Sequence, residues 1–267
     1  MAGPCVPYGP VDDWRGPAVA DAWVGTSGWS YKTWRGRFYP RGLAQRNWLG
    51  HYAGHLRSVE VNATFYRLPS EPMIQHWAEA TPDHGFRFSL KAWRAITHMK
   101  RLRDCGDHLA SFFAATRALG RRRGPVLFQL PPKFAKDLER LDTFLAMLPA
   151  NQRCAMEFRD PSWHDQEVFA CLEKHGVAFV PFEIGPLSAP RVVTAPFVYV
   201  RLHGREAAYR GLYDEGALRD WAEWLHGERT KGRDIHIYFD NTDTDDDAVR
   251  NALRMQALLD GMAGSAP

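Results

Sequence analysis

Short runs in which apolar and polar residues alternate recur along the chain, and stretches with helical spacing lie between them. Alternation at a period of two is typical of a strand with one buried face, whereas apolar residues three and four positions apart indicate an amphipathic helix. Eight strand-then-helix units predict an α/β fold of the (β/α)8 TIM-barrel type rather than an open doubly wound sheet. The strand-like runs are AWVGTS (22–27), RSVEVNATF (57–65), FRFSLKA (86–92), PVLFQL (125–130), RCAMEFR (153–159), VAFVPFE (177–183), FVYVRLH (197–203) and IHIYFDN (235–241).

The sixth unit departs from this pattern. Between residues 183 and 197 the sequence IGPLSAPRVVTAP is rich in proline, which cannot continue a helix, so we expect a loop in place of the sixth helix. The predicted organisation is a single barrel domain at 22–260, preceded by a flexible N-terminal arm at 1–21 and followed by a C-terminal tail at 261–267.

Composition adds a soluble, cytoplasmic location to this expectation. The chain has 267 residues, 45% of them hydrophobic, which is enough for a large core. No apolar run approaches the roughly 20 residues of a membrane helix, and the first residues lack the basic start and apolar run of a secretion signal. No two cysteines form a C-x-x-C pair, so neither a zinc knuckle nor a redox motif is predicted; the cysteines are Cys5, Cys105, Cys154 and Cys171.

Polar side chains follow one face of the second strand-like run. In VEVNATFY (59–66) the apolar residues fall on one side, while Glu60, Asn62 and Thr64 fall on the other. Inward side chains of a barrel strand fill its interior, and active sites lie where the strands end. We therefore expect these three polar residues to point inward.

Most of the other predicted strands also carry a polar group near the same end. A buried polar group without a partner costs about 1–3 kcal/mol, and more if it is charged, so these groups must pair, hold water or face a ligand. The inward charged set is Glu60, Lys91, Glu157, Arg159, Arg201 and His203.

Several of these runs belong to longer motifs that resemble the YecE-like family, domain of unknown function 72, over about residues 23–259. The resemblance implies a TIM-barrel fold and no particular reaction, because the family has no assigned activity. Asp240, Glu183 and the acidic run DTDDD depart from the family pattern, so their roles are left unassigned. The motifs are GTSGWSYKTWRGRFYP, VEVNATFYRLPS, FRFSLKAWRAITHMKRL, GPVLFQLPP, EFRDPSW, VYVRLHG and YFDN.

The convergence of charges predicts an enzyme, a hydrolase, lyase or isomerase, that uses general acid-base chemistry. Its substrate would be a small anionic molecule bearing phosphate or carboxylate, or a polyhydroxylated one. Glu60 or Glu157 would be the base and His203 the acid or proton shuttle, while Lys91 joins the catalytic set and clamps an anion. The substrate-binding set is Trp29, Asn62, Thr64, Tyr66, Gln129, Arg159, Arg201 and Asn241. Asn241 requires a bend at the strand end to face inward.

Other interpretations of the same charges remain open. They could form a structural ion-pair network that only fills the barrel. Two carboxylates across a mouth also suit a glycosidase, if Glu60 and Glu157 are suitably spaced. No cofactor or metal is expected. Three sets of residues are minor candidates for a metal site: His51 with His55; Asp243, Asp245 and Asp247; and Glu60, Glu157, Glu183 and His203.

Two loops favour an alternative partner, nucleic acid. GWSYKTWRGRFYP (28–40) interleaves rings with cations, and KAWRAITHMKRLR (91–103) carries several cations and no acid. The rings of the first loop could equally form a local aromatic core. After the seventh strand, HGREAAYRGLY could be a lid with hinges at Gly204 and Gly211 that brings Tyr209 or Arg210 over the mouth.

Overall fold

In the computed structural model, residues 20–242 and 245–264 are described, so most of the predicted N-terminal arm and the last three residues of the predicted tail lie outside the described residues. Within this part of the chain, ten strands form one curled sheet in the order β6-β5-β4-β3-β2-β1-β10-β9-β7-β8. Every pairing is parallel except that of β7 with β8. The strands are β1 (Ala22–Ser27), β2 (Ser58–Val61), β3 (Arg87–Lys91), β4 (Arg123–Leu130), β5 (Cys154–Phe158), β6 (Ala178–Phe179), β7 (Phe182–Ile184), β8 (Leu187–Ser188), β9 (Phe197–Leu202) and β10 (Asp234–Phe239).

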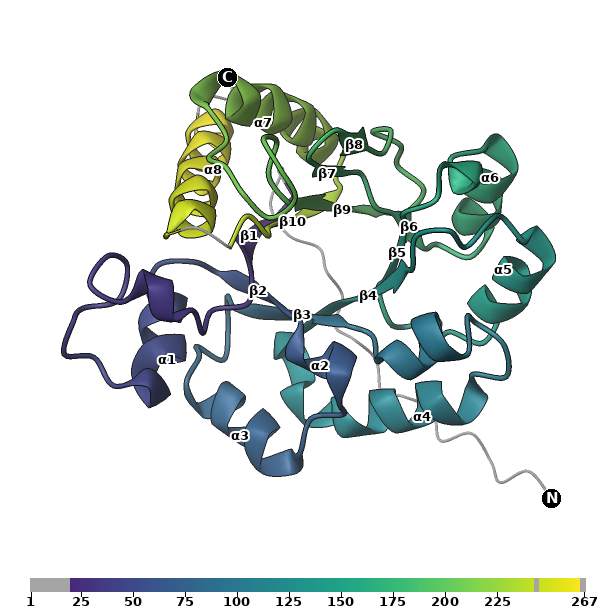
Figure 1. Cartoon of the computed structure of the whole chain (residues 1–267), viewed down its shortest axis with the longest axis horizontal. Coiled ribbons are helices and arrows are strands. Elements are labelled where there is room, and N and C mark those ends of the chain that lie inside the picture. Colours follow the sequence, from purple (N-terminus) through teal and green to yellow (C-terminus); the bar gives the residue numbers. More distant parts are fainter. Residues whose placement is uncertain (1–19, 243–244, 265–267) are drawn as a thin grey trace.

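The longer helices lie outside the curled sheet, as Figure 1 shows. Three of them begin at an aspartate whose side chain accepts a backbone N–H of the first turn: Asp137, Asp165 and Asp214. None of the helices in the described ranges is long and apolar enough to cross a membrane. The helices are α1 (Trp48–Ala53), α2 (Ala63–Tyr66), α3 (Glu71–Glu79), α4 (Gly106–Ala115), α5 (Leu138–Leu145), α6 (Gln166–Lys174), α7 (Glu215–Thr230) and α8 (Asp247–Ala263). Since α8 continues to Ala263, the predicted tail at 261–267 begins inside a helix.

The two faces of the sheet carry different side chains. Alternate residues of the strands pack against the helices in the larger apolar cluster, for example Val59, Phe88 and Val200. On the other face, the Tyr238 hydroxyl lies 2.6 Å from both Ser58 Oγ and Ser89 Oγ. These hydrogen bonds join β10 to β2 and β3 across the concave interior of the sheet.

The second predicted strand is too long. β2 ends at Val61, Asn62 has helical backbone angles (φ −78°, ψ −20°), and Thr64 lies in α2. The expectation that Asn62 and Thr64 are strand residues is therefore wrong, because the chain turns into a helix directly after Val61. Thr64 Oγ1 instead donates to the carbonyl of Lys91 at 2.7 Å and ties α2 to the end of β3.

The sixth predicted strand is divided in two. Val180 and Pro181 separate β6 from β7, and Pro181 has no backbone N–H for a sheet hydrogen bond. β6 pairs with β5, while β7 pairs with β9. No helix occurs in the described residues 185–196, where a loop was predicted; the short β8 pairs antiparallel with β7 there.

Replacement of Gly25 by Ala is expected to destabilise the sheet by about 1–3 kcal/mol, because overpacking a filled interior forces its neighbours apart. A Cβ at Gly25 would overlap the backbone carbonyl of Ser58 on the paired strand β2. Urea denaturation followed by circular dichroism measures the loss. Gly227→Ala is the control, because a Cβ there meets nothing within 4 Å. Equal stability of the two variants would contradict the overlap.

Candidate functional site

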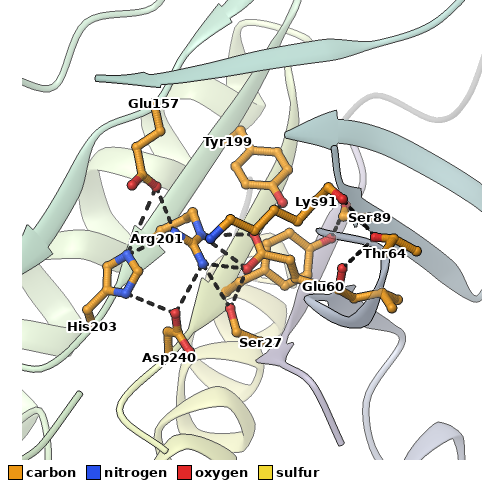
Figure 2. A network of polar contacts seen from close by, with 12 residues as sticks. Ser27, Glu60, Thr64, Ser89, Lys91, Glu157, Tyr199, Arg201, His203 and Asp240 are labelled. Carbon is orange, nitrogen blue, oxygen red and sulfur yellow. Dashed lines mark hydrogen bonds and ion pairs between the residues drawn. The ribbon is translucent and has the colours of Figure 1, made fainter. Parts of the chain in front are cut away.

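Charged side chains from separate strands meet at Arg201 on β9, whose side chain is only 1% exposed (Figure 2). Its Nε lies 2.9 Å from Oε2 of Glu60, and its Nη2 lies 2.7 Å from Oε1 of the same residue. Its Nη1 donates to Glu157 Oε2 at 2.9 Å, and its Nη2 donates to Asp240 Oδ2 at 3.0 Å. One guanidinium therefore binds carboxylates from β2, β5 and the end of β10.

Glu60 has further hydrogen-bond partners besides Arg201. Tyr199 OH donates to Oε2 at 2.6 Å, and Ser27 Oγ donates to Oε1. Burial, followed by the charge of Glu60, raises the pKa of Tyr199 well above its ordinary value, so the phenol keeps its proton. Both oxygens of the buried Glu60 carboxylate are occupied by donors of the chain itself.

Glu157 is also fully buried and is bound by two guanidinium groups. Arg159 Nε donates to Oε1, while Arg201 occupies Oε2. Burial alone would raise the pKa of Glu157, but the positive charges of Arg159 and Arg201 hold this pKa well below its ordinary value. A carboxylate held this firmly in its ionised form is a weak proton acceptor.

The contacts of His203 assign its protonation. Its Nε2 lies 3.0 Å from Arg159 Nη2 and 3.1 Å from Arg201 Nη1, and a guanidinium can only donate. Nε2 is therefore unprotonated, and the proton of the neutral ring is on Nδ1. That nitrogen lies 3.0 Å from Asp240 Oδ2, although the contact is not a well-formed hydrogen bond. Burial would raise the pKa of Asp240, but His203 and Arg201 lower it.

Lys91 lies beside this network but outside its pairings (Figure 2). Its ammonium is 4.6 Å from the centre of the Phe65 ring, and it forms no ion pair or hydrogen bond with any residue in the described ranges. Burial, followed by the positive charge of Arg201, lowers the pKa of Lys91 to about 8. Each carboxylate nearby already has cationic or hydroxyl donors, so this amine is left available.

The loops that follow β3 and β9 have strained backbones. A π-helix occupies Ala95–Met99, and positive φ angles follow it at Arg101, Leu102 and Asp104. Such conformations concentrate at functional sites. Burial, followed by the charges of Lys91, Arg94 and Arg101, lowers the pKa of His98 in this loop to about 4.

The loop after β9 reaches the network through Tyr209. The rings of Tyr209 and His203 lie 5.5 Å apart at 84°, and Tyr209 has a positive φ of 66°. A Cβ at Gly204 would overlap the carbonyl of Arg210, so the tight turn requires glycine. This arrangement places Tyr209 at the predicted mouth; the lid movement of this loop stays a prediction.

The structure brings together the predicted residues Glu60, Lys91, Glu157, Arg159, Arg201 and His203, and Thr64 joins them through the carbonyl of Lys91 (Figure 2). The remaining substrate-binding candidates lie in other surroundings. Trp29 packs edge-on against Trp77 at 5.7 Å. Asn241 donates to Gly211 O and Asn251 Oδ1, so it supports the loop after β9. Gln129 donates to the carbonyl of Leu130 and Tyr66 is 67% exposed. Asn62 Oδ1 is buried and has no hydrogen-bond partner among the described residues.

Sequence reasoning missed four residues that contact the site. Tyr199 falls on the same side of its strand as Arg201 but has no charge to mark it, and Asp240 stood out only as a departure from the family pattern. Ser27 ends β1 without any charge to draw attention, and Phe65 was assigned to a strand. The alternation of β9 and the position of Ser27 at a strand end were the available signals.

Among the described residues, the structure does not assemble the metal sites considered from the sequence. Glu183 accepts from Trp221 Nε1 at 3.1 Å and has no contact with Glu60 or Glu157, so the proposed four-residue metal set is not assembled. His51 Nε2 bonds to the carbonyl of Phe38, Asp245 pairs with Arg37, and Asp243 lies outside the described residues. In the described chain, one three-residue group has metal-ligand spacing, Asp142, Cys171 and His175, and it lies between α5 and α6.

The aromatic loop after β1 mostly packs on itself. Trp34 and Tyr39 are fully buried, and their rings contact each other and Phe38. A cavity of about 1230 Å³ lies at the opposite end of the strands, where Trp23, Arg87, Arg153 and His236 are part of its lining. α/β proteins with parallel sheets bind ligands at the carboxyl ends of their strands, so the network around Arg201 is the candidate site.

Comparisons with known proteins agree with this fold. The family model "Protein of unknown function DUF72" matches residues 23–266. The UPF0759 protein YunF of Bacillus subtilis strain 168 is 27% identical over 89% of this chain and 94% of its own length. The crystal structure of a DUF72 family protein from Thermotoga maritima is 28% identical and has a TM-score of 0.80, covering 90% of this chain and 99% of its own. A DUF72 family protein from Enterococcus faecalis, 21% identical, has a TM-score of 0.75 over 91% of this chain and 99% of its own.

Proposed function

The chain belongs to the DUF72 family of proteins of unknown function, and we propose that it is an enzyme that moves protons on a small anionic or polyhydroxylated substrate at the carboxyl ends of the strands. The observation that carries the proposal is the position of Lys91: an amine without a partner in the described residues, beside three buried carboxylates that all have partners. A structural ion-pair network would be expected to pair its lysine as well.

The proposed roles differ from those expected from sequence. Lys91 is the proton-transfer group, because its pKa of about 8 lies near neutral pH, where general acid-base catalysis is most efficient. Glu60 and Glu157 bind Arg201, and their negative charges also act on the Lys91 amine. Arg201 has all its donors engaged within the chain, so anion binding falls to Arg159, whose Nη1 has no partner in the described ranges.

The same proposal includes closure of the sheet into a (β/α)8 barrel. The segment formed by β6 and β7 pairs with β5 on one side and with β9 on the other. Arg201 N also donates to the carbonyl of Pro181, between those two strands, at 3.1 Å. A cytoplasmic location is part of the proposal because Cys105, Cys154 and Cys171 are free thiols.

Proton exchange with solvent tests the function. The protein is incubated in deuterated buffer with phosphorylated and carboxylated sugars, keto acids and hydroxy acids, and proton NMR follows the loss of substrate C–H signals. We expect exchange of at least one compound, at a rate that rises through pH 8 as Lys91 loses its proton. Lys91→Met should slow it by about 10²–10⁴-fold, the usual contribution of a positioned acid or base.

The matched control is Lys100→Met, which removes an exposed lysine of the loop that follows Lys91. Exchange should be unchanged in this variant, and thermal melting should show that both variants fold. Full exchange activity in Lys91→Met would contradict the assigned role. Absence of exchange with every one of these compounds would contradict the proposed function.

A second candidate function, nucleic-acid binding, is favoured by one observation. Exposed large apolar side chains gather in segments that follow strands, among them Tyr66 and Met99, which is 71% exposed. Exposed cations lie near them in sequence, including Arg67 and Arg101. Exposed rings and cations suit single-stranded nucleic acid. Fluorescence anisotropy with labelled oligonucleotides tests this: binding that weakens steeply with salt supports it, and no binding at low salt removes it.

A further inference from the structure

We propose that Lys91 is a covalent nucleophile, whose amine forms an imine with the carbonyl carbon of a small aldehyde or ketone that carries a phosphate or carboxylate. This inference rests on the proposed function of the same site and names its class of substrate. It accounts for a feature that proton transfer alone leaves unexplained: a cation held among carboxylates without being locked to any of them.

The geometry leaves the amine of Lys91 available. The carboxylate of Glu60 is bound by Ser27, Tyr199 and Arg201, which leaves no short contact for a further donor. Glu157 is bound by two guanidinium groups, and Asp240 lies between Arg201 and His203. Lys91 is instead over the face of Phe65, a neighbour that holds a cation only weakly.

The backbone of Lys91 is held by a hydrogen bond, whereas its side-chain amine has no ion pair or hydrogen bond in the described residues. Lys91 is the last residue of β3, and its carbonyl accepts the hydroxyl of Thr64. The strained π-helix begins four residues later, and His98 within it contacts the same Phe65 ring at 4.9 Å. A nucleophile on a rigid strand end, beside a strained loop, is positioned for reaction with a bound substrate.

The electrostatics favour the neutral amine that such a reaction needs. At pH 7 roughly one Lys91 amine in ten is neutral if its pKa is about 8, against about one in three thousand for an ordinary lysine. After reaction, the protonated imine again carries one positive charge at this position. The net charge of the site is therefore the same before and after the reaction, with three carboxylates and three cations.

The step proceeds without an oxidant, reductant or cofactor. The lone pair of neutral Nζ attacks the carbonyl carbon, the carbonyl oxygen takes a proton, and a carbinolamine forms. The carbon–oxygen bond then breaks, and the oxygen leaves as water with a proton from solvent. Nitrogen keeps one hydrogen in the protonated imine, so one ammonium and one carbonyl give one iminium and one water. Arg159 Nη1, which is free in the described chain, would hold the anionic group of the substrate.

Reductive trapping tests the imine. The protein at pH 7 is mixed with sodium cyanoborohydride and either glyceraldehyde 3-phosphate or pyruvate, with acetone as the neutral carbonyl. Peptide mass mapping then locates the secondary amines. We expect a tenfold or greater excess of adduct at Lys91 over Lys100, more adduct with the anionic carbonyls than with acetone, and loss of this adduct in Lys91→Met but not in Lys100→Met.

The outcomes separate this inference from the function on which it rests. Adducts spread over all lysines according to exposure would overturn the imine, and this comparison needs only the wild-type chain. No adduct at Lys91, together with solvent exchange that depends on Lys91, would also overturn the imine but leave the proton-transfer function standing. Neither adduct nor exchange would remove both.

Discussion

Replacement of Arg201 by Met is expected to lower the free energy of unfolding by about 3–5 kcal/mol, the usual cost of removing one partner of a buried ion pair. Arg201 is the common partner of Glu60, Glu157 and Asp240, and it is almost completely buried. Without it, Glu60 keeps only its hydroxyl donors and the carboxylate cluster becomes self-repelling. Urea denaturation at pH 7, monitored by tryptophan fluorescence and circular dichroism, measures the change.

An exposed pair provides the matched control. Arg254→Met removes an arginine that binds Glu215 on the surface between α7 and α8, and we expect no measurable loss. Adding Glu60→Gln to Arg201→Met should restore part of the lost stability, because the double variant removes one of the unpaired charges. A loss for Arg201→Met no larger than that of Arg254→Met would show that the network does not hold the sheet together.

The second large effect is a loss of stability in acid. The pKa values of Glu157 and Asp240 are lower in the folded state than in an unfolded chain, where they are about 4.3 and 3.9. Their contribution is therefore fully present above pH 5 and is lost as the pH falls below these unfolded values toward the folded ones. Each unit of difference corresponds to about 1.4 kcal/mol.

Glu157→Gln isolates this contribution. The amide keeps the shape of the side chain but cannot ionise, so the variant should be less stable at pH 7 and should lose less stability between pH 5 and pH 3. Glu139→Gln, at an exposed position on α5, is the control and should follow the wild-type curve. Parallel curves for Glu157→Gln and wild type would contradict the lowered pKa.

The period-two pattern predicted much of what matters here. It placed Glu60, Glu157, Arg201 and His203 on the inward face, and the parallel order of the strands then brought these residues together. The pattern failed where the backbone stops being a strand: at Asn62, which has helical angles, and at Pro181, which interrupts the sixth run. Alternation describes side chains only as long as the chain stays extended.

The pairing within the site could not be predicted from the sequence. Charges on non-adjacent strands can combine in many ways, and the choice depends on distances that a sequence does not contain. The structure shows that Arg201 takes all three carboxylates while Lys91 takes none. Because of this pairing, we assign proton transfer to Lys91 and not to Glu60 or Glu157.

The titration of the Lys91 amine shows whether this amine can exist in neutral form near physiological pH. Carbon and nitrogen NMR of isotopically labelled lysines, with Lys91→Met to assign the signal, follows the amine from pH 6 to pH 11. A midpoint near pH 8 is the predicted result for a desolvated amine without an ion-pair partner. A midpoint at or above the ordinary value of about 10.4 would mean that Lys91 is solvated or paired, and would rule out the role proposed for its amine.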